Sequence, residues 1–388
     1  MTIKNRTRKY KKYVKTQPGL YLDLASTFFF SRLWGMKTLS FLLTVLLAVP
    51  AYPCTRVLWD TKKHDIIVGR NMDWAEDTGS NMWLFPRGME RDGLAEKNSL
   101  KWISKYGSVI LSMYDMGTGD GINEKGLTAN LLFLTESDFG VRDEKIPGMS
   151  VSMWAQYFLD NFETVAEAVA AMEKTPFQVL MASVQTSQGI KQGTVHLAIS
   201  DKTGDSAVIE YIKGQPKIYH GREYKVMTNS PPFDQQLVTM KQYKGFGGNK
   251  DLPGTTAAAD RFVRAAFYAQ QLPQPNDYRE SIAGVFSVLR NVSQPFGTPD
   301  PTRPYISTTR WRTVADLNRG LYFYESTMSP FIVWVDLPKL NFKKNAGVKK
   351  INLVKNYELS GDITRKFKPT KVFQFLKPDV PAGMKAQL

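Results

Sequence analysis

The sequence predicts an α+β protein in which helices cover a mostly antiparallel sheet on two faces. Short apolar runs bounded by turn residues indicate β-strands, and two pairs of helical segments interrupt the series of strands. The chain of 388 residues is 43% hydrophobic, which is ordinary for a soluble globular protein with a sizeable core. It shows no internal repeat and no low-complexity linker.

Each predicted element comes from a local pattern. Strands are expected at residues 55–59, 65–70, 83–85, 108–113, 127–134, 194–200, 207–212, 216–219, 224–228, 305–312, 320–324 and 331–335. The segments 216–219 and 224–228 are expected to extend the sheet that contains the hairpin 194–212. Helices are expected at 151–159, 163–174, 257–272 and 278–291, and Pro176 stops the second of them.

An apolar run at residues 39–49 follows Met36 and Lys37. A charged start, about ten apolar residues and a small-residue exit are typical of a secretory signal peptide. The run is too short for a transmembrane helix, which needs about 20 apolar residues. We therefore expect export to the periplasm or beyond, removal of residues 1–53, and a single domain at 54–388. Translation from Met1 and from Met36 both fit this pattern.

The positive charge of the chain is concentrated in this leader. Residues 1–53 carry nine Lys/Arg and one Asp/Glu, so the net charge of +15 falls by 8 to +7 when they are removed. A nucleic-acid-binding role thereby loses its main support.

Cys54, the only cysteine of the chain, lies directly behind the leader. Three interpretations compete: a small buried hydrophobe, a lipid attachment site in a non-enzymatic binding protein, and an N-terminal nucleophile. Pro53 argues against lipidation, because a lipoprotein site needs a small residue before the cysteine. In the third interpretation the α-amino group of Cys54 takes the thiol proton, since a free α-amine titrates near ~8.

Five motifs downstream favour the nucleophile. They are Cys54-Thr55-Arg56, Gly69-Arg70-Asn71-Met72-Asp73-Trp74, the run DGINEKGL at 120–127, Thr228-Asn229-Ser230-Pro231 and Asp260-Arg261-Phe262. Together they resemble the choloylglycine hydrolase family, which includes bile salt hydrolases and penicillin V acylases. The resemblance runs from Cys54 to about residue 335. It implies the four-layer αββα sandwich of N-terminal-nucleophile hydrolases, the hydrolysis of linear amides, and a homotetramer.

The resemblance also implies catalytic roles for five residues: Cys54, Arg70, Asp73, Asn229 and Arg261. A carboxylate at Asp73 would orient the α-amino group, and Arg70 beside the thiol would lower its pKa. Without the family pattern these two would be a surface ion pair.

Asn229 and Arg261 have everyday explanations beside their implied roles. Asn229 would otherwise be a turn residue, and the resemblance makes its amide part of an oxyanion hole. Arg261 would otherwise be a charge on a helix face, and the resemblance makes it support the charge network.

A substrate pocket is expected at Met72, Trp74, Trp83 and Phe133, although aromatic and methionine side chains on strands are also typical of a core. Phe133 stands where bile salt hydrolases carry an asparagine and penicillin V acylases an aromatic residue. Its backbone N–H still suits an oxyanion donor. This position favours aromatic acyl groups, so a penicillin V acylase-like activity is expected first. A conjugated bile salt hydrolase and an N-acyl homoserine lactone acylase remain alternatives.

No cofactor or metal is expected. His64, His196 and His220 are scattered along the chain, and the segment 120–126 has the composition of a structural turn rather than of a metal loop. The expected partner is therefore a small amide substrate, with no nucleic acid and no stable membrane anchor after processing.

Overall fold

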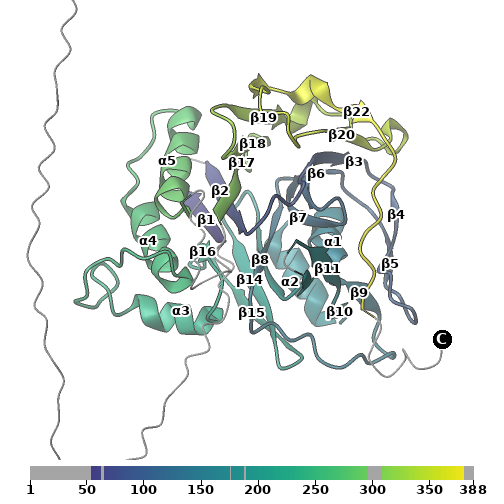
Figure 1. The fold of residues 1–388 in the computed structure, drawn as a ribbon, viewed down its shortest axis with the longest axis horizontal. Coiled ribbons are helices and arrows are strands. Elements are labelled where there is room, and N and C mark those ends of the chain that lie inside the picture. The colour runs from purple at the N-terminus through teal and green to yellow at the C-terminus, as the bar shows by residue number, and fades with distance from the viewer. Residues whose placement is uncertain (1–53, 63–64, 175, 188, 296–307, 380–388) are drawn as a thin grey trace, which may run out of the picture. The chain divides into compact units, whose positions relative to one another are not determined.

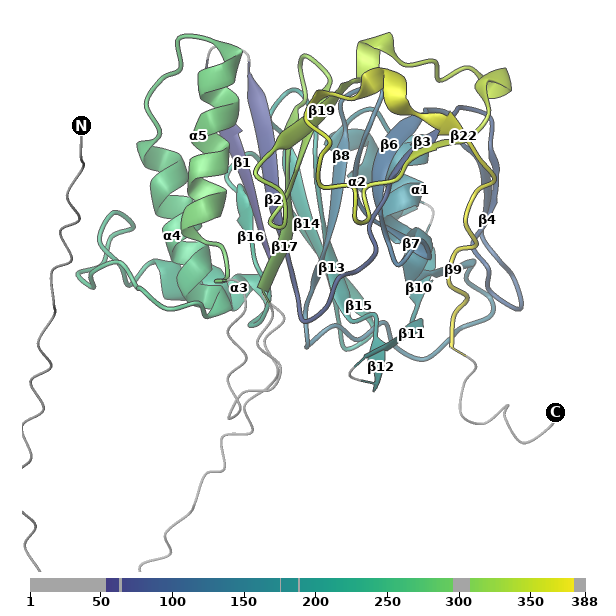
Figure 2. The same ribbon diagram turned by 45° about the horizontal axis from the view of Figure 1, so that its top comes forward.

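Two β-sheets lie face to face between two layers of helices in the computed structural model (Figures 1 and 2). The structure describes residues 54–62, 65–174, 176–187, 189–295 and 308–379. The predicted leader (1–53), His64, residues 305–307 and the last nine residues lie outside this range.

The first sheet has seven strands among these residues. In spatial order they are β16 (Val226–Met227), β1 (Thr55–Asp60), β2 (Ile66–Trp74), β17 (Thr308–Asp316), β18 (Leu321–Ser326), β19 (Ile332–Asp336) and β21 (Gly361–Asp362). All of these neighbours pair antiparallel except β19 and β21. Helices α3 (Phe233–Met240), α4 (Ala258–Gln271) and α5 (Tyr278–Asn291) lie together, and α4 and α5 contact β1 and β2.

The second sheet has nine strands in the same range. In spatial order they are β15 (Gln215–His220), β14 (Ser206–Ile212), β13 (Val195–Ser200), β8 (Thr128–Phe133), β7 (Gly117–Asn123), β6 (Ser108–Met113), β3 (Met82–Phe85), β20 (Lys349–Ile351) and β22 (Lys368–Pro369). Helices α1 (Trp154–Asn161) and α2 (Val165–Lys174) cover its outer face, and the 3₁₀ turn η1 (Val151–Met153) leads into α1. The predicted four-layer αββα sandwich is thus confirmed.

Short two-stranded pairs complete the fold. They are β4 (Glu90–Asp92) with β5 (Lys101–Ile103), β9 (Gly148–Ser150) with β10 (Gln178–Leu180), and β11 (Ser183–Thr186) with β12 (Gly189–Gln192). The 3₁₀ turns η2 (Leu337–Lys339), η3 (Lys344–Ala346) and η4 (Thr364–Lys366) follow β19.

The strands of the second sheet divide the interior into two apolar clusters, because successive side chains of a strand point to opposite faces. Ala198 belongs to the first cluster, between the sheets, whereas its neighbours Leu197 and Ile199 belong to the second cluster, under α1 and α2. The two names are kept below.

Three sequence predictions need correction. Residues 224–228 do not extend the second sheet, because β16 pairs with β1 through Arg56↔Met227 in the first sheet. The expected turn at 121–126 is shorter, since β7 continues to Asn123. Helix α3, the strands β4, β5, β7 and β9 to β12, and the strands beyond β19 were not predicted. The predicted strands and helices that fall in the described residues lie within a few residues of their expected places.

Candidate active site

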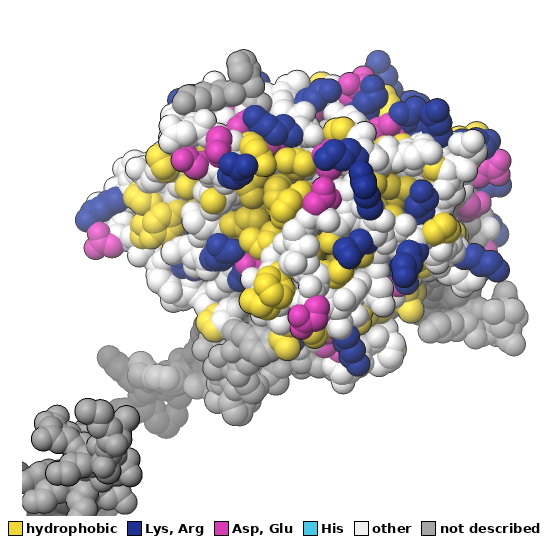
Figure 3. Space-filling model, turned by 90° about the horizontal axis from the view of Figure 1, so that it is seen from above, with side chains coloured by type: hydrophobic (Ala, Val, Ile, Leu, Met, Phe, Trp, Pro, Cys, Tyr) yellow, Lys and Arg dark blue, Asp and Glu magenta, His cyan; other side chains and the backbone are white. Residues whose placement is uncertain are grey.

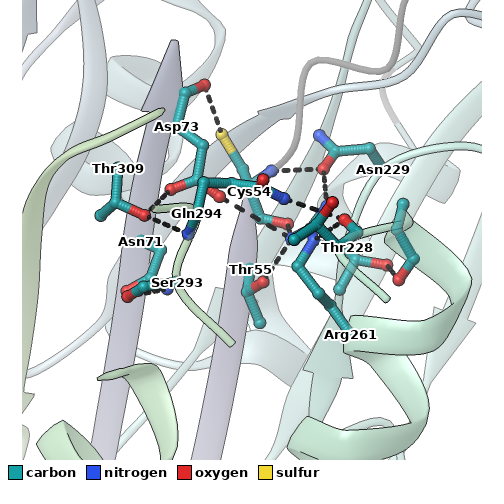
Figure 4. A network of polar contacts seen from close by, with 12 residues as sticks. Cys54, Thr55, Asn71, Asp73, Thr228, Asn229, Arg261, Ser293, Gln294 and Thr309 are labelled. Carbon is teal, nitrogen blue, oxygen red and sulfur yellow. Dashed lines mark hydrogen bonds and ion pairs between the residues drawn. The ribbon is translucent and has the colours of Figure 1, made fainter. Parts of the chain in front are cut away.

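Cys54 lies at the start of β1 and is buried, with 2% of its surface exposed. Its backbone N–H donates a hydrogen bond to Oδ1 of Asn229, and its thiol donates to the backbone carbonyl of Asp73 across 3.7 Å (Figure 4). Burial raises the pKa of the Cys54 thiol above its usual value, and the Arg70 guanidinium opposes this only in part. Arg70 thus lowers the thiol pKa as expected, but burial outweighs its effect. A buried thiol of raised pKa needs a nearby base in order to become a nucleophile.

Arg70 projects from β2 into the space between the sheets. It forms a buried ion pair with Asp120, with 3.6 Å between Nη1 and Oδ2, and donates to the carbonyl of Leu131 at 2.8 Å. Its guanidinium also lies over the ring of Trp311 at 4.7 Å. Asp120 lies within β7 rather than in a turn, so the sequence analysis missed its part in fixing Arg70.

Asp73 is completely buried three residues further along β2. Its Oδ1 accepts a hydrogen bond from Thr309, and its Oδ2 lies 3.9 Å from Nη1 of Arg261. Among the described residues Oδ2 has no hydrogen-bond partner. Burial raises the pKa of Asp73 to about 6, against the opposing effect of Arg261. In this structure the backbone N–H of Cys54 donates to the Asn229 side chain, whereas Asp73 accepts a hydrogen bond from the thiol through its backbone carbonyl.

Arg261 reaches Cys54 from helix α4. Its Nη1 donates to the carbonyl of Cys54 at 2.6 Å, and its Nη2 donates to Oδ1 of Asn229 at 3.0 Å. Burial lowers the pKa of Arg261 to about 10, which leaves the guanidinium charged at neutral pH. A single cation thereby fixes the cysteine backbone, the Asn229 amide and the Asp73 carboxylate relative to one another.

Asn229 follows β16 and is held from both sides. Its Nδ2 donates to the carbonyl of Phe133 at 2.7 Å, and its own carbonyl accepts a hydrogen bond from Nε2 of Gln236. Gln236 lies on α3 and is fully buried. Its place beside Asn229 was not predicted from the sequence. The only available signal was a glutamine seven positions after the asparagine, in a helix that was itself not predicted.

An apolar cavity of about 150 Å³ opens beside the thiol. Cys54, Met72, Trp74 and Phe133 all line it, and the rings of Trp74 and Phe133 lie 6.1 Å apart. Three of the four predicted pocket residues are thus brought together next to the cysteine.

Trp83 does not line this cavity, and its prediction as a pocket residue is wrong. Its side chain belongs to the second cluster, its indole N–H donates to Asp115 at 2.8 Å, and its ring packs edge-on against Phe373 at 5.0 Å. The neighbouring Met82 points to the first cluster instead, as strand alternation requires.

A chain of hydrogen bonds holds the Trp74 wall of the cavity. The Trp74 indole donates to the Tyr114 hydroxyl at 2.7 Å, and that hydroxyl donates to Glu76 Oε1 at 2.7 Å. Glu76 Oε2 accepts from the backbone of Ser187, in the turn between β11 and β12. The cavity wall is therefore connected to the β11–β12 hairpin through two polar side chains that the sequence analysis did not select.

Other candidate sites carry no comparable chemistry. His196 is buried and bonded to Glu210 and to the carbonyl of Thr228, while His220 contacts Asp205 on the surface. No cluster of three or more potential metal ligands occurs among the described residues. In that same part of the chain, no helix is both long and apolar enough to cross a bilayer. On the face drawn in Figure 3, Lys and Arg side chains are scattered among acidic, polar and apolar groups rather than gathered in a stripe.

The four-layer αββα sandwich is the fold of the N-terminal-nucleophile hydrolases, and Cys54 directly precedes β1 in one of its two sheets. The sequence profile of the linear amide C–N hydrolases, choloylglycine hydrolase family, matches residues 54–352. The chain belongs to this family, whose members hydrolyse C–N bonds of linear amides.

Two relatives and one solved structure place the chain within the family. It is 45% identical over 347 residues to the penicillin V acylase of Pectobacterium atrosepticum, covering 83% of this chain and 92% of that protein. The structure of penicillin V acylase from Agrobacterium tumefaciens matches with a TM-score of 0.76 and 50% identity, covering 83% of this chain and 99% of that one. The bile salt hydrolase/transferase of Clostridium perfringens is 26% identical over 326 residues, covering 75% of this chain and 94% of that protein.

Proposed function

We propose that this protein is an exported amidohydrolase that uses Cys54 as its N-terminal nucleophile and prefers small amides with an aromatic acyl group, as in penicillin V. The observation that carries the proposal is the placement of a buried thiol at the edge of an apolar cavity, within the hydrogen-bond network of Asn229 and Arg261. The higher identity to penicillin V acylases than to bile salt hydrolases supports this substrate class.

Removal of residues 1–53 frees the α-amino group of Cys54, which then accepts the thiol proton. The thiolate attacks the amide carbonyl carbon, and the carbonyl oxygen becomes negatively charged. This oxyanion accepts hydrogen bonds from the Asn229 side-chain amide and from the Phe133 backbone N–H. The C–N bond breaks as the α-ammonium group returns the proton to the leaving amine. The α-amino group of Cys54 then deprotonates a water molecule, which hydrolyses the thioester and releases the carboxylic acid.

Three residues prepare Cys54 for these steps. Asn229 Oδ1 already accepts the hydrogen bond of the cysteine nitrogen, and Arg261 holds the adjacent carbonyl. Oδ2 of Asp73 accepts no hydrogen bond from the described residues, so it offers the freed ammonium group an acceptor.

The cavity volume favours a small acyl group. A cavity of about 150 Å³ matches in size one known to hold a benzene ring, whereas the steroid acid of a bile salt is several times larger. Conjugated bile salts and N-acyl homoserine lactones are therefore the second candidates. A lipidated binding protein, the rival of another class, leaves the polar network around the thiol unexplained.

The test is a hydrolysis panel with penicillin V, glyco- and tauro-conjugated bile salts and long-chain acyl homoserine lactones. We expect turnover of penicillin V that Cys54→Ala abolishes. No turnover of any amide by the wild-type chain would overturn the proposal.

The processing step has its own readout. The most natural signal-peptidase cut follows Ala51, so a second, autocatalytic step is proposed to remove Tyr52 and Pro53. In it the thiol attacks the carbonyl carbon of Pro53, the Pro53–Cys54 C–N bond breaks to leave a thioester and a free α-amino group, and water hydrolyses the thioester to release Tyr52-Pro53. Edman degradation of the active secreted protein should begin at Cys54, and Cys54→Ser should slow the second cut. A fully active enzyme that begins at Tyr52 or earlier would exclude the α-amino base.

A further inference from the structure

The last described residues of the chain, 370–379, form an extended segment that belongs to no helix or strand. This segment, called the strap below, runs past β4 and β5 towards β9 (Figure 1). Backbone hydrogen bonds fix it at three places: Thr370 to Val348, Leu376 to Met116 and Asp379 to Met181. It is thus held along its length by elements far from it in sequence.

Leu376 is the most firmly held residue of the strap. Its N–H donates to the carbonyl of Met116 at 2.8 Å, and its own carbonyl accepts from the hydroxyls of Ser150 at 2.6 Å and Ser152 at 2.8 Å. Three residues later, Asp379 accepts from the backbone and the hydroxyl of Ser183. The position of the Leu376 side chain is therefore determined by its own backbone contacts.

The Leu376 side chain lines the cavity that begins at Cys54. Cys54 and Met72 belong to the first cluster, whereas Val151 and Ala182 belong to the second, against which the partly buried Leu376 packs. The cavity therefore connects the two clusters, with the thiol on one side and the strap on the other. An acyl group joined through its carbonyl carbon to the Cys54 sulfur extends from the first cluster towards Leu376.

We propose that Leu376 limits the length of the acyl group, so that one aromatic ring fits and a long fatty acyl chain does not. This inference rests on the proposed function, because it concerns the acyl part of the same amide substrates. Phe375, the preceding strap residue, does not line the cavity, and the Arg91 guanidinium lies over its ring at 5.6 Å. The two neighbours therefore separate the effect of the cavity wall from the effect of a loosened strap.

The test compares kcat/KM for p-nitroanilides of acetic, phenoxyacetic, hexanoic, decanoic and dodecanoic acid, using the full chain and its variants. Leu376→Ala should raise the ratio of dodecanoyl to phenoxyacetyl turnover by at least about tenfold, since a methylene in an apolar pocket changes discrimination by ~10–200-fold. Leu376→Trp should lower phenoxyacetyl turnover while sparing the acetyl anilide. Phe375→Ala, the matched control, should leave the ratios unchanged.

Two outcomes would overturn the inference: unchanged ratios in both Leu376 variants, or equal changes in Phe375→Ala and Leu376→Ala. Product binding provides a readout that does not depend on turnover. Quenching of tryptophan fluorescence by phenoxyacetate and by dodecanoate should show that Leu376→Ala gains affinity for the longer acid. If the wild-type chain hydrolyses no amide, the proposed function fails, while unchanged relative affinities would overturn the role of Leu376 separately.

Discussion

The two sides of the cavity differ in how they are stabilised. On the thiol side, Arg70, Asp73 and Arg261 are each at most 2% exposed. Arg70 forms an ion pair with Asp120, and Arg261 forms one with Asp73. On the strap side, Leu376 and Val151 are apolar, and their positions depend on packing and on neutral hydrogen bonds.

This difference separates chemistry from substrate choice. Buried charges tolerate little change, because removing one partner leaves another charge without compensation. Apolar walls tolerate volume changes at moderate cost and alter what fits. We therefore expect variants on the thiol side to reduce kcat and stability, and variants around the acyl pocket to alter KM and substrate ratios.

The largest effect is expected for Arg261→Met. The substitution leaves the Cys54 carbonyl, Asn229 Oδ1 and the buried Asp73 carboxylate without their cation. Breaking a buried pair in this way costs about 3–5 kcal/mol of unfolding free energy, which urea unfolding measures. The matched control is Arg264→Met on the same helix, because Arg264 is also buried but donates to the neutral carbonyls of Pro253 and Thr255. Equal losses in the two variants would contradict the special place of Arg261.

Asn229→Ala should lower kcat by about 10²–10³ while the fold persists, because it removes one oxyanion donor. The variant should be made in a chain whose initiator methionine directly precedes Cys54, so that incomplete processing cannot imitate the effect. Asn71→Ala is the control, since Asn71 is a buried asparagine of β2 that donates to the carbonyl of Leu289 and does not line the cavity. Near-normal kcat in folded Asn229→Ala would remove Asn229 from the site.

A pH effect of opposite sign on activity and on stability is expected from Asp73. Its folded pKa of about 6 lies above the ordinary value of 3.8, so the carboxylate is present in the fold only above about pH 6. Activity that needs this carboxylate should fall as the pH drops through 6. The folded state binds this proton more tightly than the unfolded state, so the Asp73 contribution to stability is present at low pH. It is lost as the pH rises from about 4 to 6, by on the order of 3 kcal/mol.

Asp73→Asn tests both signs at once, because the amide does not titrate. The acidic limb of the kcat/KM profile near pH 6 should disappear in this variant. As the pH rises, the unfolding free energy of the wild type should fall relative to that of the variant. A wild-type profile without a limb near pH 6 would show that the Asp73 charge has no part in turnover.

Local patterns predicted the longer apolar strands and most helices, because alternation and amphipathic spacing depend on neighbouring residues. The short strands and β7, which contains three glycines, were missed because they lack such a pattern. Helix α3 escaped, since its eight residues follow two prolines and bury only Phe233 and Gln236. The sheet assignment of β16 failed because strand pairing is a long-range property: residues 226–227 meet β1 from across the chain.

Site residues could be predicted where they belong to motifs. The prediction failed where the role of a residue depends on the face of the strand to which its side chain points. Cys54, Arg70, Asp73, Asn229 and Arg261 are brought together as the motifs indicated, while their catalytic roles stay predictions. Trp83 was misplaced because a change of one position along a strand moves a side chain to the opposite face. Gln236 and Leu376 were missed because nothing in their local sequence indicates the site that they reach.

The smallest effect is expected at Tyr114, and it is the most stringent test of the difference between the two sides of the cavity. Tyr114→Phe keeps the ring in the cavity wall and removes the hydroxyl that joins the Trp74 indole to Glu76. Losing such a hydrogen bond costs about 1 kcal/mol, so KM for penicillin V should rise about fivefold. Because Tyr114 contributes nothing to the network around Cys54, kcat should change less than twofold. Tyr219→Phe is the control, since Tyr219 packs against Phe233 away from this cavity. A fall in kcat with KM unchanged would mean that the aromatic wall acts on the chemical step, and the separation between the two sides of the cavity would no longer hold.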